Sequence, residues 1–308
     1  MRTYMENGRL QRSEDFCTSV ANGNAEVDLN VMSDVEVVIH LLQSNARSLK
    51  CQMCCVDPNP LVCVRLALAL ANNIDLVSLE ILGCSDLVAV IVVQAVKSNR
   101  VLETLLIQIQ GGHIGLQFDD VCFAMPNAFQ NNTSLKTFDF AATSNLINDD
   151  IGCVLAKALR SSSTLQSFRM DTRDNTIGDS AGLAIANVLR TNVILDAFEW
   201  DARGSNVGMQ TQLAIDNALR VNVRITNFVF RHGPLFDDAT VYNGRNWCER
   251  NSQLYNHWRS LALLACADNL GFGSLISSSY RSAVFAFLLP CFCSAAPRWF
   301  LKSGWSAP

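Results

Sequence analysis

Apolar residues in the middle of the chain recur with two different periods, one after the other. Residues 151–159, 181–189 and 214–219 place them three and four positions apart, which makes one apolar stripe on a helix. After a polar break, each segment is followed by the pattern apolar-x-x-apolar-x-apolar. The last two positions of that pattern have the period of two that strands show. The sequence therefore predicts a helix followed by a strand, three times over.

The same strand pattern recurs on both sides of these segments. Its clear copies are Leu76/Leu79/Ile81, Leu102/Leu105/Ile107, Leu135/Phe138/Phe140, Leu165/Phe168/Met170, Leu195/Phe198/Trp200 and Ile225/Phe228/Phe230. A fainter copy is Leu49/Gln52/Cys54. The first residues of successive copies are 27, 26, 33, 30, 30 and 30 positions apart. A nearly fixed period of this size predicts a stack of about seven repeated units joined by loops of different length.

Polar residues at fixed places in the units predict how the backbone is satisfied. Near the expected helix starts the sequence has Asp150, Asp179, Ser180 and Gln210, which we expect to accept the free amides. Asparagines precede the strands at Asn73, Asn99, Asn132, Asn192 and Asn222, and follow them at Asn145, Asn175 and Asn206. We expect these asparagines to bond backbone groups left open at the turns.

The phrases "NDDIGCVLAKALRSSSTLQSFRM" and "GDSAGLAIANVLRTNVILDAFEW" resemble the ribonuclease-inhibitor type of leucine-rich repeat, which NOD-like receptors also contain. The resemblance covers roughly residues 27–232. Phe, Met or Trp replaces Leu at several strand positions, and the strand-to-Asn distance is longer than in the family pattern. The resemblance implies an α/β leucine-rich-repeat solenoid, a curved horseshoe with parallel strands on the concave face and helices on the convex face.

The ends of the chain differ from the repeats. Residues 1–26 form a polar lead-in, and Val27, Leu29 and Val31 predict a first strand that caps the stack. Residues 233–270 predict a helical C-terminal cap with apolar residues at helical spacing, namely Trp247, Leu254, Trp258, Leu261 and Leu264. Residues 271–308 are a linker and a short apolar tail.

The tail contains the apolar run "AVFAFLLPCFCSAAP", residues 283–297, which is interrupted by Pro290. Its roughly 14 apolar positions fall short of the ~20 that a membrane-spanning helix needs. Three hypotheses stay open: a helix packed on the cap, an exposed tail, and a membrane anchor through residues 283–296. The first residues, "MRTYMENGRLQRSEDF", lack the apolar core of a secretory signal, so we expect a cytoplasmic protein.

Composition and motifs argue against several activities. The net charge is −4 and no basic block is present, so a nucleic-acid partner is not expected. The pair Cys51-x-x-Cys54 has no second pair at finger spacing, and "QGGHIG" at residues 110–115 lacks the Lys and Ser/Thr of a phosphate loop. His40, His113, His232 and His257 are scattered. We therefore expect no metal, no cofactor and no enzyme activity.

One enzymatic hypothesis is kept as the alternative. The triplet Cys266-Ala-Asp268 resembles the Cys-x-Asp nucleophile of secreted bacterial ubiquitin ligases that also carry leucine-rich repeats. Only about 75 residues follow the repeats, whereas those ligases need a large helical catalytic domain. The alternative is thus a substrate-recognition adaptor or effector, for example in ubiquitin transfer, whose activity lies in residues 233–308.

The leading hypothesis is a non-enzymatic module that presents its concave face to another protein. Side chains that alternate with the core positions of each strand should line up in columns on that face. The candidate partner-binding residues are Glu80, Asp139, Arg169, Asp171, Glu199, Asp201 and Arg231. Their acidic members predict recognition of a basic segment by charge complementarity. A solvated face without a specific partner is the other interpretation, because no aromatic anchor lies among these positions.

Overall fold

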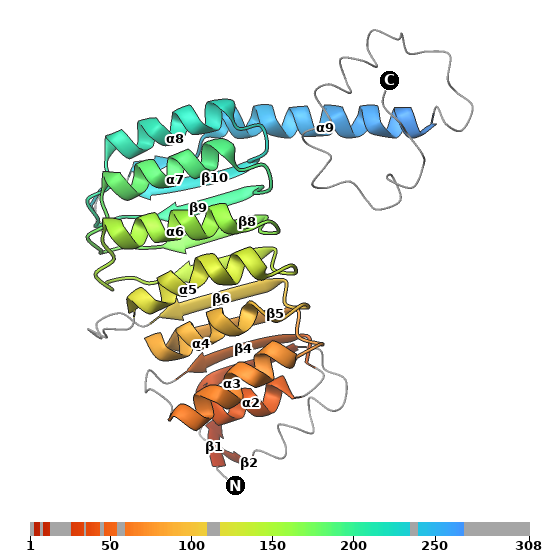
Figure 1. Ribbon diagram of the computed structural model, residues 1–308, viewed down its shortest axis with the longest axis vertical. Helices are drawn as coiled ribbons and strands as arrows, with labels where there is room; N and C mark the ends of the chain where they lie inside the picture. The colour runs from red at the N-terminus through yellow and green to blue at the C-terminus, as the bar shows by residue number, and fades with distance from the viewer. Residues whose placement is uncertain are drawn as a thin grey trace. The chain divides into compact units, whose positions relative to one another are not determined.

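The computed structural model describes residues 3–6, 9–12, 26–33, 35–43, 46–53, 59–109, 118–234 and 240–267. Internal contacts divide the chain into two compact units, Met1–Cys248 and Glu249–Pro308. The first unit holds the sheet and the helices that cover it (Figure 1). Helix α9 (Arg245–Ala267) begins in the first unit and continues into the second.

Strands β3 to β11 of the described chain form a single sheet, in which each strand lies next to the strand that follows it in the sequence. Strands β3 to β10 pair in parallel, and β11 pairs with β10 antiparallel. Their bounds are β3 (Glu26–Ser33), β4 (Ser48–Met53), β5 (Ser78–Cys84), β6 (Thr104–Ile109), β7 (Thr137–Ala141), β8 (Ser167–Asp171), β9 (Ala197–Asp201), β10 (Asn227–His232) and β11 (Thr240–Tyr242).

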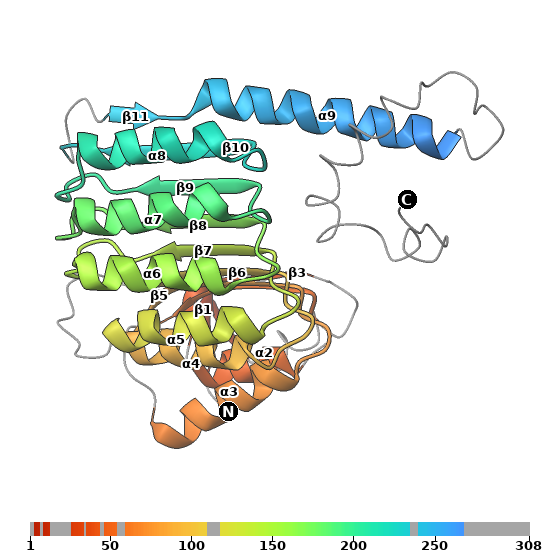
Figure 2. The ribbon, with the colours of Figure 1, turned by 45° about the horizontal axis from the view of Figure 1, so that its top comes forward.

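One helix follows each of the strands β3 to β9, and these helices lie side by side on one face of the sheet (Figure 2). Parallel strands are ~4.8 Å apart, whereas packed helices are ~8–10 Å apart, so successive units must fan out with the strands on the inner side. This repeated, open arrangement confirms the predicted α/β solenoid. The helices are α2 (Val35–Leu42), α3 (Pro60–Asn72), α4 (Asp86–Val96), α5 (Phe118–Asn131), α6 (Asp149–Ser161), α7 (Asp179–Thr191) and α8 (Met209–Val221).

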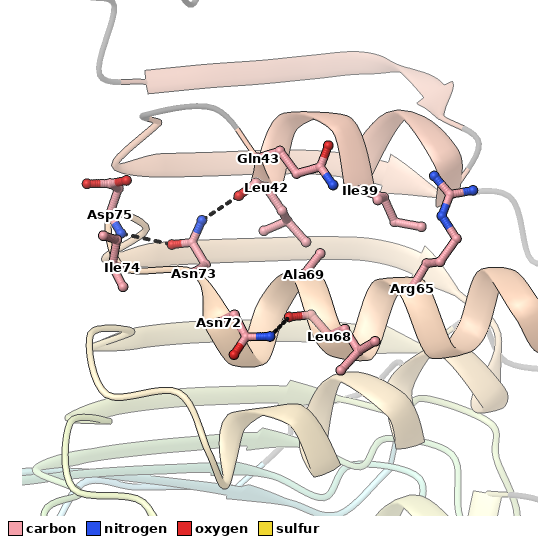
Figure 3. A pocket seen from close by; sticks show the side chains of 10 residues that line it. All are labelled: Ile39, Leu42, Gln43, Arg65, Leu68, Ala69, Asn72, Asn73, Ile74 and Asp75. Atoms are coloured by element: carbon pink, nitrogen blue, oxygen red, sulfur yellow. Dashed lines mark hydrogen bonds between the residues drawn. The ribbon is translucent and has the colours of Figure 1, made fainter.

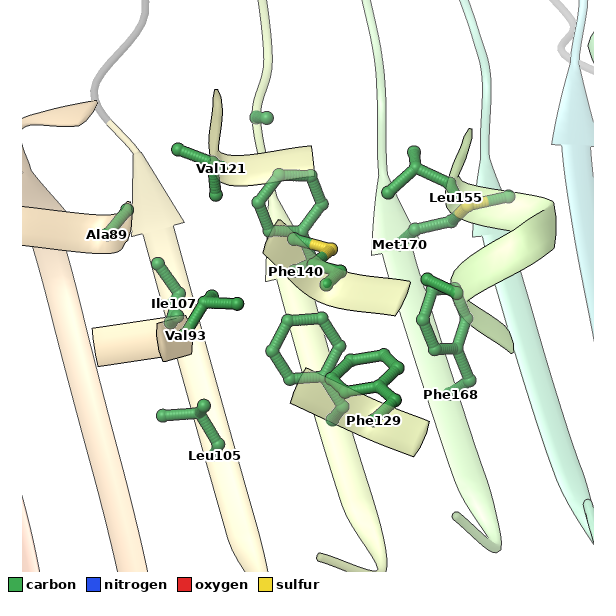
Figure 4. Close-up of a cluster of buried hydrophobic side chains, with 14 of the residues drawn as sticks. Ala89, Val93, Leu105, Ile107, Val121, Phe129, Phe140, Leu155, Phe168 and Met170 are labelled. Atoms are coloured by element: carbon green, nitrogen blue, oxygen red, sulfur yellow. The ribbon is translucent and has the colours of Figure 1, made fainter. Parts of the chain in front are cut away.

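The core lies between the sheet and the helices, and the predicted strand residues fill it (Figure 4). The rings of Phe168 and Phe198 stack 6.0 Å apart, and those of Phe198 and Phe228 stack 5.6 Å apart. Trp200 is fully buried and its Nε1 donates to Thr172 Oγ1 over 2.8 Å. Aromatic side chains thus fill core positions where the repeat pattern of the resembled family has Leu.

The register predicted from the fainter copy of the strand pattern, Leu49/Gln52/Cys54, is wrong. Leu49 pairs with Leu79 and Cys51 with Ile81, so Leu49 occupies the second core position of its unit and not the first. Ala46 takes the first position and is buried, while Gln52 is exposed and Cys54 lies outside the described residues. Backbone pairing with β5 decides the register, and Ala46 offers little apolar signal in the sequence.

The asparagines that precede the strands satisfy backbone groups of two neighbouring units, as predicted. Asn132 is buried; its Nδ2 donates to the carbonyls of Val96 and Asn99 at 2.7 and 3.0 Å. Its Oδ1 accepts from the amides of Ser134 and Leu135 at 2.9 and 2.6 Å. Asn73, Asn99 and Asn222 make the same kinds of bond.

Helices α6, α7 and α8 begin one or two residues earlier than the sequence predicts. The N-caps of α6, α7 and α8 are Asn148, Gly178 and Gly208. The predicted Asp150, Asp179, Ser180 and Gln210 lie inside the first turns instead. Gly178 and Gly208 have no capping side chain, because an aspartate of the preceding helix accepts the free amides there. The acceptor for each of these two helices therefore comes from the preceding unit.

The described ends of the first unit differ from the repeats. The predicted lead-in contains an antiparallel pair, β1 (Thr3–Glu6) and β2 (Arg9–Arg12), which the sequence did not predict. Strand β3 pairs with β4 and confirms the predicted capping strand. At the other end, Tyr242 and Trp247 both donate to Asp216 Oδ1. Residues 240–248 thereby close the last repeat.

Helix α9 covers the predicted helical segment that contains Trp247 and Leu264. The tail at residues 283–297, the "QGGHIG" segment, His113 and Asp268 lie outside the described residues. Among the helices that the structure describes, none combines the length and the apolar character that crossing a membrane requires.

Candidate functional site

The sheet face opposite the helices presents two columns of side chains. Strand pairing places the members of each column directly opposite one another, as the sequence predicted from Glu80 and Gln108 onward; Lys50, Gln52 and Leu82 extend the two columns. The first column is Lys50, Glu80, Leu106, Asp139, Arg169, Glu199 and Val229. The second is Gln52, Leu82, Gln108, Ala141, Asp171, Asp201 and Arg231. All seven predicted site residues therefore lie on this face, which we call the concave face.

The first column is a ladder of ion pairs interrupted at Leu106. Lys50 Nζ lies 3.2 Å from Glu80 Oε2. On the other side of Leu106, Arg169 lies between two carboxylates, with Nη1 3.4 Å from Asp139 Oδ2 and Nε 3.7 Å from Glu199 Oε2. Each pair is at least partly exposed, so each contributes little to stability and remains accessible to a partner.

The second column is paired with two arginines that the sequence prediction did not include. Arg173 Nη2 lies 2.7 Å from Asp171 Oδ2, and Arg203 Nη2 lies 2.7 Å from Asp201 Oδ2. Arg231, a predicted site residue, pairs with Glu199 of the first column. The sequence contains a signal for Arg173 and Arg203, because Asp-x-Arg occurs at 171–173 and again at 201–203. The arginines lie just past the strand ends, beyond the positions counted as facing outward.

These pairs change the charge of the predicted acidic patch. The four carboxylates of Asp139, Asp171, Glu199 and Asp201 are matched by the guanidinium groups of Arg169, Arg173, Arg203 and Arg231. Partial burial raises the pKa of Asp201, but the hydrogen bonds from Arg203 outweigh it, so the pKa is lowered. This part of the face is therefore a mixed-charge surface.

The pKa of Asp139 shifts in the opposite direction to that of Asp201. The pKa of Asp139 is raised, first by burial and then by the nearby Glu199, Asp171 and Glu80, and Arg169 does not compensate for these effects. Burial thus disfavours the charged form of Asp139 by more than its pairing with Arg169 favours it. On the strand next to Asp139, the outward position is the half-buried Leu106, and Glu80 follows one strand further.

A cavity of about 410 Å³ opens beside the second column. Its lining comes from the carboxyl ends of neighbouring strands and the turns after them: Gln52, Leu82, Gly83, Gln108, Ile109, Ala141, Thr143, Asp171 and Arg173. Gly83 has a φ of 66°, a left-handed conformation that glycine adopts without strain. The cavity combines an apolar wall with the Asp171–Arg173 ion pair, so it can receive a side chain that has an apolar body and a polar tip.

A second cavity, of about 540 Å³, lies between α2 and α3 on the helical side (Figure 3). Its lining includes Asn73, whose Nδ2 donates to the Leu42 carbonyl over 2.6 Å and whose Oδ1 accepts from the Asp75 amide. These bonds belong to the asparagine ladder, by which we mean the residues that follow the helices at the same place in each repeat: Asn73, Asn99, Asn132, Ser162, Asn192 and Asn222. Here the ladder joins the repeats of α2 and α3. Asn73 therefore serves the fold, and the cavity is separate from the concave face.

His232, Cys51 and Cys84 are held in structural roles. His232 is buried, with its Nε2 2.8 Å from Gln212 Oε1 and its ring stacked on Phe230. Burial raises the pKa of Cys51 and of Cys84 to about 12, which makes both thiols poor nucleophiles. No group of three metal-ligating side chains occurs within the described ranges.

The repeated strand and helix, the asparagine ladder and the outward columns define an open solenoid of the leucine-rich-repeat kind. Two solved structures are similar to parts of the chain. One is the actin-binding site 2 of leiomodin-1, with 20% identity and a TM-score of 0.39 over 51% of this chain and 86% of that one. The other is the C-terminal domain of Caenorhabditis elegans tropomodulin, with 16% identity and a TM-score of 0.32 over 46% and 81%. No family model and no curated protein matches the chain.

Proposed function

We propose that the protein is a non-enzymatic interaction module that binds another protein through its concave face. The observation that carries this proposal is the register of the two columns, which displays charged side chains from successive parallel strands. Strand spacing fixes neighbouring members of a column ~5 Å apart. Side chains on strands are positioned more rigidly than side chains on loops, and this pre-organisation lowers the entropic cost of binding.

The partner's basic side chain sits over Leu106, between Glu80 and Asp139. These two carboxylates are two strands apart, ~10 Å, so a cation placed midway lies ~5 Å from each. The aliphatic stem of a lysine or arginine packs on Leu106 while its charged head reaches the carboxylates. The position between the two carboxylates in the column is held by the uncharged Leu106, which leaves room for a cation of the partner there.

The rest of the concave face selects the partner by matched charges of both signs. Glu80 and Asp139 have longer ion pairs, 3.2 Å to Lys50 and 3.4 Å to Arg169. Asp171 and Asp201 hold Arg173 and Arg203 at 2.7 Å, so a purely basic segment gains less at the second column than over Leu106. Exposed charge pairs raise association rate and specificity more than affinity. The cavity beside Asp171 supplies the enclosed site in which a partner's anchoring side chain adds affinity.

The charge-neutralising variants Glu80→Gln and Asp139→Asn test the proposal. Affinity capture with the full chain as bait, followed by quantitative mass spectrometry, should recover a partner that both variants lose at least tenfold. Glu103→Gln is the matched control, because Glu103 also pairs with a lysine, Lys136, but lies outside the two columns. Equal capture by the wild type, the control and both variants, all with the same circular dichroism spectrum, contradicts the proposal.

Two finer assignments accompany this proposal. We infer that the repeats are of the ribonuclease-inhibitor type, supported by a full helix of 13 residues in each of α6, α7 and α8. We also place the protein in the reducing cytoplasm, supported by the buried thiols of Cys51, Cys84 and Cys122, which are not in disulfides.

The competing hypothesis is the adaptor or effector whose activity lies in residues 233–308. Deletion of residues 249–308 separates the two functions, because it removes the second unit together with Cys266 and keeps all of the first unit, Met1–Cys248. Unchanged partner capture by the deleted chain agrees with binding through the concave face. Loss of a cellular activity with capture intact favours the adaptor or effector.

A further inference from the structure

The asparagine ladder shows which residues of the helices on the convex side occupy equivalent positions. Asn132, Ser162, Asn192 and Asn222 occupy the same place after α5, α6, α7 and α8, and bond the amides two or three residues further on. Nine positions before each ladder residue is an exposed apolar side chain. These side chains, which we call the convex row, are Phe123, Cys153, Leu183 and Leu213.

The convex row is more than scattered surface apolar residues. Phe123 is 56% exposed, Leu183 41% and Leu213 62%. Single exposed apolar residues are ordinary, but the same outward position is apolar in four adjacent helices here. The next outward position along the helices, four residues later, is polar in all four: Asn127, Lys157, Asn187 and Asn217. An apolar line therefore crosses the helices at a defined height.

Charged side chains border the convex row on both sides. Seven positions later, near the helix C-termini, are the exposed Gln130, Arg160, Arg190 and Arg220. Three positions earlier, α5 and α6 carry the exposed Asp120 and Asp150, and α7 and α8 carry Ser180 and Gln210. One border is basic over three helices and the other is acidic over two.

We propose that the convex row is the docking site for an amphipathic helix of a partner protein. The apolar stripe of that helix lies on Phe123, Cys153, Leu183 and Leu213, with acidic residues along the flank that faces the arginines. Basic residues on its other flank face Asp120 and Asp150. This surface lies on the opposite side of the unit from the concave face, so the proposal stands independently of the concave binding site.

The dimensions fit one helix lying across α5 to α8. Four packed helices with axes ~8–10 Å apart span ~30 Å, which is the length of a helix of ~20 residues. The apolar and basic rows are separated by seven residues, ~10 Å along the helix axis, which is close to the diameter of a helix with its side chains. Side chains at the edge of such a bound helix therefore reach the arginine row.

Charge complementarity selects the helix over other occupants. An anionic membrane would be attracted by Arg160 and Arg190 but repelled by Asp120 and Asp150, which flank the same row. A second copy of this chain, turned about a two-fold axis along the row, would also oppose the two borders, but two convex helical faces would meet over only part of the row. A partner helix with one acidic and one basic flank satisfies both borders at once.

A designed helical peptide of 20 residues tests the docking site on the full-length protein. The probe has a leucine stripe with glutamates on one flank and lysines on the other, and carries a fluorophore for anisotropy titration. We expect binding by the wild type, and at least tenfold weaker binding by the double variants Leu183→Ser/Leu213→Ser and Arg160→Glu/Arg190→Glu. Val193→Ser/Val223→Ser is the matched control, because both valines are exposed in the same two units but outside the row.

The control variant and Asp139→Asn should both bind the peptide as the wild type does, which separates this site from the concave face. Equal affinity of all variants would overturn the proposal. It is also overturned if a dimer seen by analytical ultracentrifugation dissociates in Leu183→Ser/Leu213→Ser while the peptide does not bind. Binding of the chain to phosphatidylserine vesicles, lost in Arg160→Glu/Arg190→Glu and without peptide binding, would assign the row to a membrane instead.

Discussion

At the residue scale, an aspartate at the start of one helix caps the next helix. Asp149 Oδ1 accepts from the amides of Gly178 and Ala181 at 2.7 and 3.2 Å. Asp179 repeats the arrangement one unit later and also accepts from Thr211 Oγ1. Partial burial raises the pKa of Asp179, but these hydrogen bonds outweigh it and the pKa is lowered.

Replacing Asp179 by Ala should lower the free energy of unfolding by about 1–2 kcal/mol at pH 7, because two amides and a hydroxyl lose their acceptor. A lowered pKa means that the carboxylate contributes stability above the unfolded value, about 3.9, and loses it as pH falls through the folded pKa. The difference between wild type and variant should therefore shrink below about pH 4.

Urea denaturation at pH 7 and at pH 3 measures this difference. Asp150→Ala, an exposed position on α6, is the control and should change stability by less than about 0.5 kcal/mol at either pH. A difference between wild type and Asp179→Ala that does not decrease at pH 3 would show that the carboxylate charge is not what caps α8.

The sequence predicted a polar residue near each helix start but not which backbone it serves. Asp179 was expected to cap its own helix, α7, whereas it bonds α8. Hydropathy periods describe positions within one element, and the identity of a hydrogen-bond partner 32 residues away depends on how units stack. Arg173 and Arg203 were missed for a similar reason, since they lie past the strand whose alternation was used.

At the element scale, the asparagine ladder fastens each helix end to its neighbour and to the following strand. Asn132 is 1% exposed, and its side chain donates to two backbone carbonyls and accepts from two backbone amides. Ser162 holds the same place after α6 and accepts from the amides of Thr164 and Leu165. There Thr164 Oγ1 donates to the Leu135 carbonyl instead.

Asn132→Ala should lower the free energy of unfolding by about 3 kcal/mol or more, because buried backbone groups lose their partners at 1–3 kcal/mol each. The reverse change, Ser162→Asn, should leave stability unchanged or raise it by about 1 kcal/mol. Thermal and urea unfolding of both variants measure these effects. A loss on Asn132→Ala of less than 1 kcal/mol would show that the ladder is not needed for stability.

Gly182 allows α8 to approach α7. A Cβ at Gly182 would lie 2.0 Å from Thr211 Oγ1 and 2.4 Å from its Cγ2. Gly182→Ala gains about 1 kcal/mol of helix propensity but overpacks the contact, which costs about 1–3 kcal/mol. We expect a net decrease in stability, measured by urea denaturation. The paired variant Gly182→Ala/Thr211→Ser, which removes the methyl group, should recover part of it, and an increase in stability for the single change would contradict the close approach.

Strands β5 to β10 could be predicted from periodicity because large side chains mark every core position. Strand β11 (Thr240–Tyr242) could not, because it lies in the segment predicted as a helical cap. The first repeated strand could not, because Ala46 and Cys51 carry weak apolar signals and the register depends on pairing with β5. The antiparallel pair β1–β2 was missed because its residues are mostly polar in the sequence.

At the scale of the whole molecule, the first unit separates two surfaces with different chemistry. The sheet presents mixed charges with an apolar gap at Leu106, and the helices present the convex row between charged borders. Each repeat contacts mainly its neighbours, so exposed side chains on either face can change without disturbing the distant units. The predicted horseshoe fixes where these surfaces lie, but only their side chains decide which partners they bind.

The most direct test of concave binding is site-specific photo-crosslinking from position 106. A photoreactive amino acid in place of Leu106 should crosslink a protein partner on a peptide that contains lysine or arginine, and added Asp139→Asn should reduce the yield. The same probe in place of Val193, in the turn between α7 and β9, is the control and should not capture that partner. Crosslinks from position 193 but not from position 106 would contradict the concave binding site.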